Sequence, residues 1–300
     1  MNLLVVGAGF WGSTAAIIAR AHGHAVTVLD DGNPRGASRN AAGMVHPEWY
    51  KHASGASYRI PTRWTPAHIS ESIGWLETTW GATSRGELFS SYHNPEAWRH
   101  KPGLRTLHNP LAILESAEPE RARITHVEPA HQGWAAVAED GRTWEARTLL
   151  LATGAWTDAI LETSGLPPVG VVPLRGHALI ITGDLVSDLP MTRYVAPYRH
   201  YTIRPWLKRG QWRAGDTVER TISTERAAAT LGTLRDYCKT MIPEHQEQDV
   251  LDGYRPIRPD HGMDVETIAP GLLVATGGHR IGLGVAAVAA HDVLRRMETP

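Results

Sequence analysis

The alternation of apolar and polar positions predicts a strand, a turn, a helix and a second strand at the start of the chain. Leu3 to Val6 form a continuous apolar run, which is typical of a buried parallel strand. Small and apolar residues recur at helical density from Ala15 to Ala19, and a second apolar run covers Ala25 to Leu29. This order of elements predicts the first unit of a doubly wound, mostly parallel α/β sheet.

Two later apolar runs indicate that the chain returns to the same sheet. Thr148 to Ala152 ends in Thr153-Gly154-Ala155-Trp156, and Gly271 to Ala275 ends in Thr276-Gly277-Gly278-His279. Continuous runs of this kind are typical of parallel strands that are buried on both faces. Strand-forming residues also cluster at 124–127 and 169–181, and a hairpin is expected around Asp140-Gly141.

Helices are predicted for four other segments, 66–80, 111–117, 224–242 and 285–297. In the third of these, Leu231, Leu234, Cys238 and Met241 fall on one apolar face. Cys238 is therefore expected to be a core residue rather than a nucleophile.

The composition is that of an ordinary globular enzyme. Of the 300 residues, 42% are hydrophobic and 20% are charged, and the formal net charge is −1. The whole chain therefore offers no field that would attract nucleic acid or a membrane surface. A single cysteine fits a reducing compartment, and the first strand begins directly after Met1. With no apolar run near about eighteen residues, we expect a cytoplasmic protein with no signal peptide and no membrane span.

The turn after the first strand, Gly7-Ala8-Gly9-Phe10-Trp11-Gly12, has the pattern of a dinucleotide-binding fingerprint. Gly7 permits the tight turn, Gly9 leaves room for a pyrophosphate, and Gly12 lets the helix pack closely on the strand. The helix N-terminus then faces the phosphates. Asp30 follows Gly12 by eighteen residues, at the end of the second strand, where an acid can accept hydrogen bonds from a ribose. By itself this unit predicts FAD or NAD.

A second glycine-rich junction favours FAD. Gly277, Gly278, Gly282 and Gly284 precede the last predicted helix, so backbone N–H groups and a positive helix end can meet a ligand there. FAD is long enough to place its pyrophosphate at the first junction and the pyrimidine end of its isoalloxazine at the second. A positive helix end would favour the anionic reduced flavin, whereas a nicotinamide gains nothing from it.

These features lie within motifs that resemble those of the glycine oxidase and D-amino-acid oxidase group of flavoproteins. The motifs are Val5-Val6-Gly7-Ala8-Gly9-Phe10-Trp11-Gly12-Ser13, Ala41-Ala42-Gly43-Met44, Leu150-Leu151-Ala152-Thr153-Gly154-Ala155-Trp156, Val172-Pro173-Leu174-Arg175-Gly176 and Gly253-Tyr254-Arg255-Pro256-Ile257-Arg258-Pro259. The last of these is the most specific, and together they span most of the chain.

The resemblance implies a site and a reaction. In that group the arginine of the Gly-aromatic-Arg-Pro motif pairs with the substrate carboxylate, which assigns this role to Arg255. A planar guanidinium can donate two parallel hydrogen bonds to a carboxylate. The resemblance also places Arg280 beside the flavin and Tyr194 on the substrate lobe. The implied reaction is hydride transfer from the carbon next to an amine to the flavin, followed by hydrolysis of the imine, with molecular oxygen as electron acceptor.

The two junctions and the resemblance together predict noncovalent FAD binding by one set of residues. They are Gly7, Gly9, Phe10, Trp11, Gly12, Asp30, Asp31, Ser38, Arg39, Ala42, Gly43, Met44, Val127, Thr153, Gly154, Trp156, Gly278, His279, Arg280, Ile281, Gly282 and Leu283.

A change of composition divides the chain into two parts. From His46 to Arg105, tryptophan, tyrosine and histidine crowd together with few aliphatic residues. We therefore expect an FAD-binding domain formed by 1–45, 106–171 and 250–300. A smaller α+β substrate lobe, built on an antiparallel sheet, is expected at 46–105 and 172–249. The first lobe segment is shorter than the resemblance implies, which predicts an open site.

Between Asp188 and Asp216 the chain carries a basic strip with no acid. Its residues are Arg193, Arg199, Arg204, Lys208, Arg209 and Arg213, and Tyr198, Tyr201, Trp206 and Trp212 lie among them. This composition suits phosphate binding and base stacking, but it is equally typical of the solvated face of a hairpin. His46, Arg204, Lys208 and Arg209 are the candidate contacts to a nucleic-acid substrate.

Three hypotheses for the function follow. The first is oxidation of the C–N bond of a glycine-modified pyrimidine in DNA or tRNA, because one branch of the resembled group processes carboxymethylaminomethyl-uridine in tRNA. The alternative is oxidation of a free small amino acid such as glycine, sarcosine or a D-amino acid. The third is a flavin-containing binding module without catalysis. The sixteen histidines lack the spacing of metal ligands, so no metal site is expected.

Overall fold

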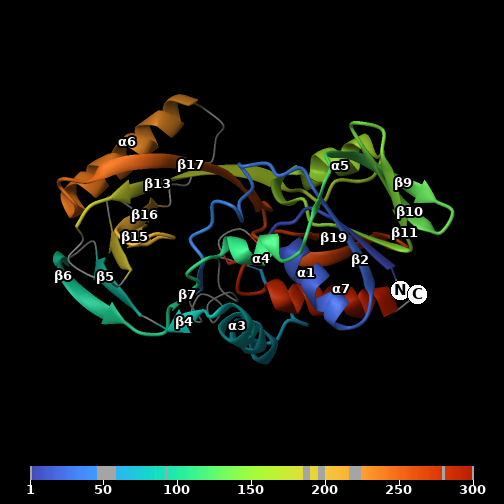
Figure 1. The fold of residues 1–300 in the computed structure, drawn as a ribbon, viewed down its shortest axis with the longest axis horizontal. Helices are drawn as coiled ribbons and strands as arrows, with labels where there is room; N and C mark the ends of the chain where they lie inside the picture. Colours follow the sequence, from blue (N-terminus) through green and yellow to red (C-terminus); the bar gives the residue numbers. More distant parts are fainter. Residues whose placement is uncertain are drawn as a thin grey trace.

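The computed structural model describes residues 2–45, 59–84, 86–91, 94–184, 190–194, 200–215, 224–278 and 281–298. Two large sheets lie along the long axis of the molecule (Figure 1). One, here called the parallel sheet, lies near both termini, and the other, the antiparallel sheet, lies beneath α6 (Thr224–Met241). This is the α/β arrangement with a separate antiparallel sheet that the sequence predicts.

The parallel sheet has the strand order β18-β19-β12-β1-β2-β8, in which only β18 runs antiparallel to its neighbour. The strands are β18 (Asp264–Ala269), β19 (Leu272–Thr276), β12 (Thr148–Leu151), β1 (Asn2–Val6), β2 (Ala25–Asp30) and β8 (Glu120–Arg121). The first predicted unit and the two later apolar runs therefore share one sheet.

Both faces of this sheet are covered, which explains its continuous apolar strands. Leu3 and Val5 belong to the core cluster on one face, and Leu4 and Val6 belong to the cluster on the other. The helices on the first face are α1 (Phe10–Ala21), α3 (Pro66–Trp80), α4 (Leu111–Glu115) and α7 (Ala286–Glu298). The elements on the second are α5 (Thr157–Thr163), β9 (Ile124–Ala130), β10 (Gly133–Ala138) and β11 (Thr143–Ala146).

Helix α3 has the predicted bounds but belongs to a different layer from the one expected. Thr65 caps its N-terminus, Pro66 occupies its first turn, and Gly81 ends it in the left-handed conformation. Ile69 and Ile73 pack with α1 and α7 in the core beside the parallel sheet, not in a substrate lobe. The composition of 46–105 is a poor guide here, because the apolar face of one helix decides where it packs.

The antiparallel sheet has the order β17-β13-β16-β15-β14-β5-β6, and its one parallel pair is β14 with β5. The strands are β17 (Gln246–Ile257), β13 (Val172–Thr182), β16 (Gln211–Gly215), β15 (His200–Pro205), β14 (Met191–Tyr194), β5 (Glu87–Ser91) and β6 (Asn94–Lys101). Strand β17 pairs with β13 along its whole length, so this sheet extends past the boundary predicted at 250.

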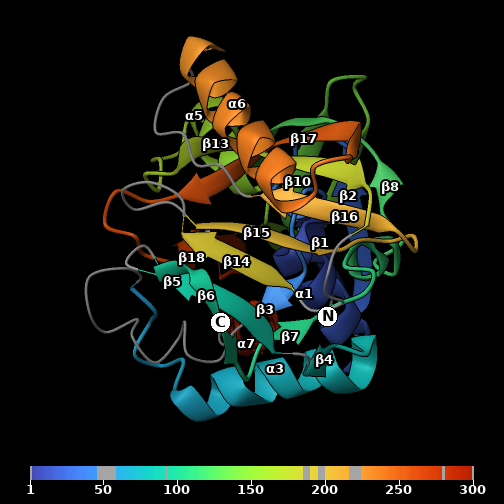
Figure 2. The same ribbon diagram turned by 90° about the vertical axis from the view of Figure 1, so that its left-hand side faces the viewer.

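The two faces of the antiparallel sheet differ. Leu179, Ile203 and Trp212 pack beneath α6, which crosses the outer face diagonally (Figure 2). Cys238 of α6 is fully buried in the same cluster, as predicted. Burial, with a smaller contribution from the charge of Glu247, raises the pKa of the Cys238 thiol to about 12, so the thiol stays protonated and unreactive at neutral pH.

None of the helices in the described part of the chain has the length and apolar character of a membrane-spanning helix.

Short elements complete the fold around the parallel sheet. They are a small sheet of β3 (Met44–Val45), β7 (Arg105–Thr106) and β4 (Thr83–Ser84), and the 3-10 turn η1 (Gly154–Trp156). Strand β3 pairs with β7, with Met44 opposite Thr106 and Val45 opposite Arg105. The loop after β2 therefore ends beside the strand that precedes α4 in the sequence.

Two helical glycines provide a matched test of this packing. A Cβ at Gly12 of α1 would overlap the carbonyl oxygen of Gly7, whereas a Cβ at Gly74 of α3 would meet nothing within 4 Å. Gly12→Ala should lower the free energy of unfolding by about 3 kcal/mol. Gly74→Ala should raise it by about 0.5 to 1 kcal/mol, since alanine loses less entropy in a helix. Urea titration of both variants measures the difference, and equal stabilities would contradict the proposed role of Gly12.

Candidate functional site

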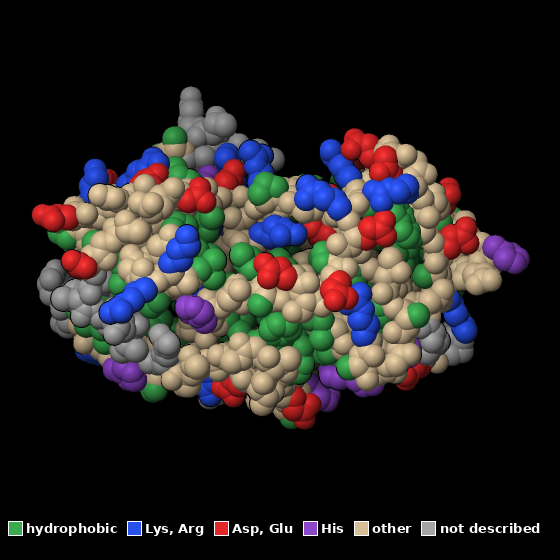
Figure 3. Space-filling model, in the orientation of Figure 1, with side chains coloured by type: hydrophobic (Ala, Val, Ile, Leu, Met, Phe, Trp, Pro, Cys, Tyr) green, Lys and Arg blue, Asp and Glu red, His purple; other side chains and the backbone are tan. Residues whose placement is uncertain are grey.

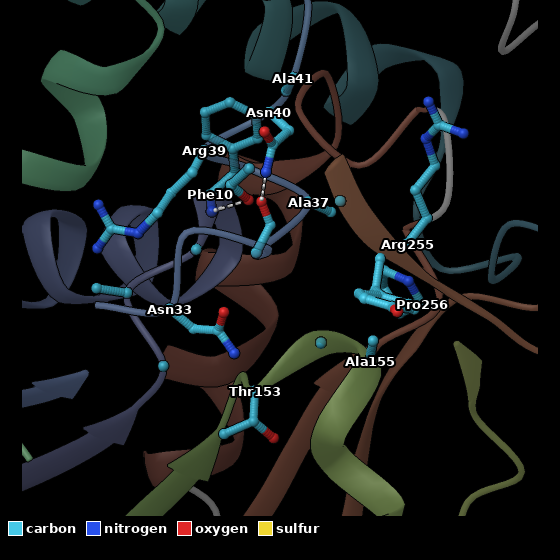
Figure 4. Close-up of a pocket in the computed structure, with 18 of the residues that line it drawn as sticks. Phe10, Asn33, Ala37, Arg39, Asn40, Ala41, Thr153, Ala155, Arg255 and Pro256 are labelled. Atoms are coloured by element: carbon cyan, nitrogen blue, oxygen red, sulfur yellow. Dashed lines mark hydrogen bonds between the residues drawn. The ribbon is translucent and has the colours of Figure 1, made fainter. Parts of the chain in front are cut away.

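A large cavity lies between the two sheets. Its volume is about 1440 Å³, well above the roughly 300 to 1,000 Å³ of a pocket for one drug-sized ligand. Its walls come from the β1–α1 turn, the loop after β2, the turn after β12, the segment before α7 and the inner face of the antiparallel sheet. The labelled residues of Figure 4 show four of these sources: Phe10, Asn33 to Ala41, Thr153 with Ala155, and Arg255 with Pro256. The cavity therefore suits a long ligand together with a smaller one.

The β1–α1 turn forms a backbone cradle at one side of this cavity. Gly7 has φ of +100°, and a Cβ there would lie 2.5 Å from the carbonyl oxygen of Ala152. Gly9 is the N-cap of α1 and has no side chain to cap it; the hydroxyl of Ser38 instead accepts a hydrogen bond from the Phe10 N–H at 2.9 Å. The first turn of α1 contains no acidic residue, so its positive end faces the cavity uncompensated by a carboxylate of that turn.

Asp30 fastens this cradle to the end of β2. Its carboxylate accepts hydrogen bonds from the backbone N–H groups of Ala8 and Gly32, each at 2.7 Å, and pairs with the Arg39 guanidinium at 3.0 Å. Asp31 accepts a hydrogen bond from the backbone of Asn33 at 2.8 Å. Asp30 thus hydrogen-bonds both the β1–α1 turn, through Ala8, and the loop after β2, through Gly32. Recognition of a ribose by Asp30 stays a prediction.

The second glycine junction lies beside the first. Gly278, Ile281, Gly282 and Leu283 line the cavity, and the indole N–H of Trp11 donates a hydrogen bond to the Gly282 carbonyl at 2.7 Å. The two junctions are therefore in contact through one side chain, as the FAD hypothesis requires. His279 and Arg280 lie outside the described residues.

The loop after β2 connects the cradle to the antiparallel sheet. Gly36 forms a β-bridge with Tyr254 of β17, and the Tyr254 N–H donates to the Arg35 carbonyl at 2.9 Å. The Arg213 guanidinium donates to the Asn40 carbonyl at 2.7 Å. Ala42, Gly43 and Met44, three of the predicted cofactor residues, continue this loop and line the cavity.

The antiparallel sheet contributes a row of cavity-lining residues from five neighbouring strands. Cross-strand register places them side by side in the order Leu251, Ala178, Gly215, Thr202 and Thr192. The Thr192 hydroxyl donates to the buried Glu87 carboxylate at 3.3 Å and lies 2.8 Å from the Thr202 hydroxyl. Small residues near β13 and hydroxyls near β14 therefore give this wall a shallow, polar surface.

Arg255 is half-buried on β17 and lines the same cavity. It is opposite Leu174 in the register with β13, and in Figure 4 its side chain extends away from Thr153. Next to it, Tyr254 packs edge-on against Trp156 with ring centroids 6.2 Å apart. The structure thus brings Arg255 into one cavity with both glycine junctions. Tyr194 ends β14, but its side chain is outside the description, and so is His46.

In the part that the structure describes, the basic strip does not form the surface predicted for nucleic acid; Arg199 and the side chain of Arg193 lie outside the described residues. Arg204 and Arg213 are only 1% and 2% exposed, and both pack against the Trp206 ring. Tyr201 and Trp212 are also buried, so they cannot stack on bases. The candidates Lys208 and Arg209 are exposed, and on the face in Figure 3 basic and acidic side chains are interspersed. The strand alternation explains the error: Arg204 and Arg213 are cross-strand partners that point inward.

Val127 stays a prediction as a cofactor residue. Its side chain is buried in the core between the parallel sheet and β10, and it does not line the cavity. Residues 121–125, just before and at the start of β9, line the cavity in its place, with Asp140 and Arg142 from the neighbouring hairpin. The sequence signal for this edge is the polar stretch before the strand, which the apolar pattern of β9 obscured.

The family of the chain follows from sequence comparison. A family described as "DAO: FAD dependent oxidoreductase" matches residues 2–118 and 119–296. The chain belongs to this family, and the protein is an FAD-dependent oxidoreductase.

Individual relatives are distant. The bifunctional protein ThiO/ThiG of Trichormus variabilis is 23% identical over 342 aligned positions, which cover 96% of this chain and 51% of that protein. The chain thus spans about half the length of this relative. Iminodiacetate oxidase from Chelativorans sp. BNC1 has a similar structure (TM-score 0.73, 20% identity, 99% of this chain and 96% of that one). So does glycine oxidase from Geobacillus kaustophilus (TM-score 0.76, 17% identity, 99% and 94%). At such identities the likeness shows a shared fold.

The residues of the cavity fit FAD. A cradle that any Cβ at Gly7 would fill, a helix N-terminus and a second junction meet around one elongated space. Gly12 lies behind the cradle and allows α1 to approach it, while Thr153, Gly154 and Trp156 line the cavity from the turn after β12. No group of three or more potential metal ligands occurs in the part of the chain that the structure describes.

Mutation of buried and of exposed residues of the basic strip should change the stability of the protein by different amounts. Arg204→Met removes a buried cation from Trp206 and from the carbonyls of Leu107 and Pro205, and should cost about 2 kcal/mol or more of stability. The double variant Lys208→Ala with Arg209→Ala changes exposed side chains and should stay within about 0.5 kcal/mol. Thermal and urea unfolding measure both; a destabilised double variant would contradict this assignment.

Proposed function

We propose that this protein oxidises the C–N bond of a small, free glycine-type amine that carries a carboxylate, with FAD as its cofactor. The observation that carries the proposal is the position of Arg255 in the same cavity as both glycine junctions. A carboxylate bound there would be held next to the cofactor rather than on a separate surface. The names of two similar structures, an iminodiacetate oxidase and a glycine oxidase, support the same substrate class.

The residues of the chain act in this proposal by binding and orientation. The guanidinium of Arg255 holds the substrate carboxylate in a fork of two hydrogen bonds, which fixes the position of the carbon next to the amine. Trp156 and Tyr254 pack against each other and line the same cavity. Bound FAD supplies the hydride acceptor. No side-chain acid is required if the amine binds in its deprotonated form.

A nucleobase substrate is the weaker candidate. Its support in the sequence is the short first lobe segment together with the basic strip, and two of the six basic residues of that strip are buried. Lys208 and Arg209 are exposed, but two cations give only a slight dependence of binding on salt. The polar wall of the antiparallel sheet suits a compact polar substrate better. We propose molecular oxygen as the electron acceptor, in line with the two oxidases among the similar structures.

Two arginines near the end of β17 separate binding from structure. Arg255→Ala should raise KM about 100-fold for a carboxylated amine, because two charge-assisted hydrogen bonds are lost. Arg258→Ala is the matched control: Arg258 pairs with Glu266 and lies outside the large cavity, so its KM should change little. Steady-state kinetics and the visible flavin spectrum measure the effect. An unchanged KM in Arg255→Ala would remove the basis of the proposal.

Anaerobic mixing with candidate substrates tests the substrate class directly. Glycine, sarcosine, iminodiacetate and D-alanine should include at least one compound that bleaches the flavin absorbance. An oligonucleotide with a glycine-substituted pyrimidine should neither reduce the flavin nor bind at physiological salt. Rapid reduction by the oligonucleotide, with all four free amines inert, would reverse the preference.

A further inference from the structure

Trp11 is placed to control the second glycine junction from the first. It is the second residue of α1, and it lines the cavity although its side chain is only 8% exposed. The glycine fingerprint requires small residues at Gly7, Gly9 and Gly12, and nothing in that pattern requires an indole at Trp11. The role of this side chain must therefore be sought in its contacts.

Several of these contacts are with the segment before α7. The indole N–H donates to the Gly282 carbonyl at 2.7 Å. A Cβ at Gly278 or Gly282 would lie 3.2 Å from the indole ring, so both positions are small where the ring rests on the backbone. The same segment is closed by a hydrogen bond from the Ile281 N–H to the Gly278 carbonyl at 2.9 Å. The turn from Gly278 to Gly282 thus packs directly against the indole ring of Trp11.

The hydrogen bond also fixes the direction of an N–H group. In a trans peptide the carbonyl and the following N–H point in opposite directions. Because the Gly282 carbonyl points to Trp11, the Leu283 N–H of the same peptide points away from it. Gly282 and Leu283 both line the cavity. Rotation of this peptide would change the polar groups that the second junction presents.

A second tryptophan packs against the ring of the first. Trp64 packs edge-on against Trp11 with ring centroids 5.9 Å apart, and its own indole N–H donates to the buried carboxylate of Asp292 at 3.1 Å. Asp292 belongs to α7 and also pairs with Arg63 at 2.7 Å. The ring that packs against Trp11 is therefore itself hydrogen-bonded to α7.

We infer that Trp11 is a positioning residue for FAD: its hydrogen bond to Gly282 sets the orientation of the second glycine junction, which lies at the flavin end of the cofactor. The residue acts through the backbone of Gly282 and Leu283. Preorganised backbone dipoles stabilise charge because no energy is spent on turning them when the charge develops. The inference rests on FAD binding, which the family establishes, and is independent of the substrate proposal.

The test compares Trp11→Phe with Trp64→Phe. Each replaces a buried indole by a smaller aromatic ring and removes one N–H donor, but only Trp11→Phe removes the bond to Gly282. Trp11→Phe should raise the dissociation constant of FAD about tenfold. The loss should be larger for reduced than for oxidised FAD, which makes the reduction potential of the bound flavin more negative. Trp64→Phe should bind FAD within about twofold of the unmodified chain.

Flavin fluorescence titration and anaerobic redox titration supply these values, and both are independent of turnover. If Trp11→Phe does not fold, β-(3-benzothienyl)alanine at position 11 keeps the ring shape and lacks only the N–H donor. Equal FAD affinity in the unmodified protein and the position 11 variant would overturn the inference, and so would an equal loss in Trp64→Phe. Loss of substrate oxidation with unchanged FAD binding and potential would count against Trp11 as a cofactor-positioning residue, without bearing on Arg255.

Discussion

Close contact between backbones at the carboxyl ends of the parallel strands is the constraint on which the rest of the structure depends. A Cβ at Gly7 would meet the Ala152 carbonyl at 2.5 Å, and a Cβ at Gly12 would overlap the Gly7 carbonyl. Gly277, after β19, has φ of +91° and is packed equally closely on the backbone of Gly262 and Met263. Because side chains are absent at these points, the backbones pack closely, and Gly7 presents its peptide group to the cavity. Peptide N–H groups are the natural partners of a phosphate or a flavin edge.

The loop after β2 connects the parallel sheet to the antiparallel sheet along the wall of the cavity. It leaves the cradle at Asp30, bridges to Tyr254 of β17, and is fastened to Arg213 through the Asn40 carbonyl. Gly253 leaves the space that the Asn40 side chain occupies against β17, since a Cβ there would lie 3.1 Å from it. Arg213 therefore has a structural role, which could not be inferred from its position in the basic strip. It holds the loop after β2, which lines the cavity, onto the sheet that carries Arg255.

The sequence predicted what depends on local pattern and on backbone sterics. The continuous run Leu3 to Val6 is typical of a buried strand, and the structure covers it on both faces. The turn at Gly7 and the close approach at Gly12 are also as predicted, whereas the pyrophosphate role of Gly9 stays a prediction. Arg204 and Arg213 could not be placed, because their burial depends on which face of β15 and β16 receives α6. That choice is made by contacts with Leu234 and Tyr237, far away in the sequence. Helix α3 was misplaced for the same reason: its bounds are local, but its neighbours are not.

The two walls of the cavity divide cofactor binding from substrate choice. On the parallel sheet part of the wall is glycine backbone, so substitution at those glycines changes the fold before it changes selectivity. On the antiparallel sheet every second residue of a strand faces the cavity while its neighbours pack beneath α6, as Thr202 does between Tyr201 and Ile203. Side chains such as Thr192 and Arg255 can therefore be exchanged without disturbing the core beneath α6. A fold divided in this way can keep one cofactor while the substrate changes, and selectivity for one amine over another must arise on the antiparallel sheet.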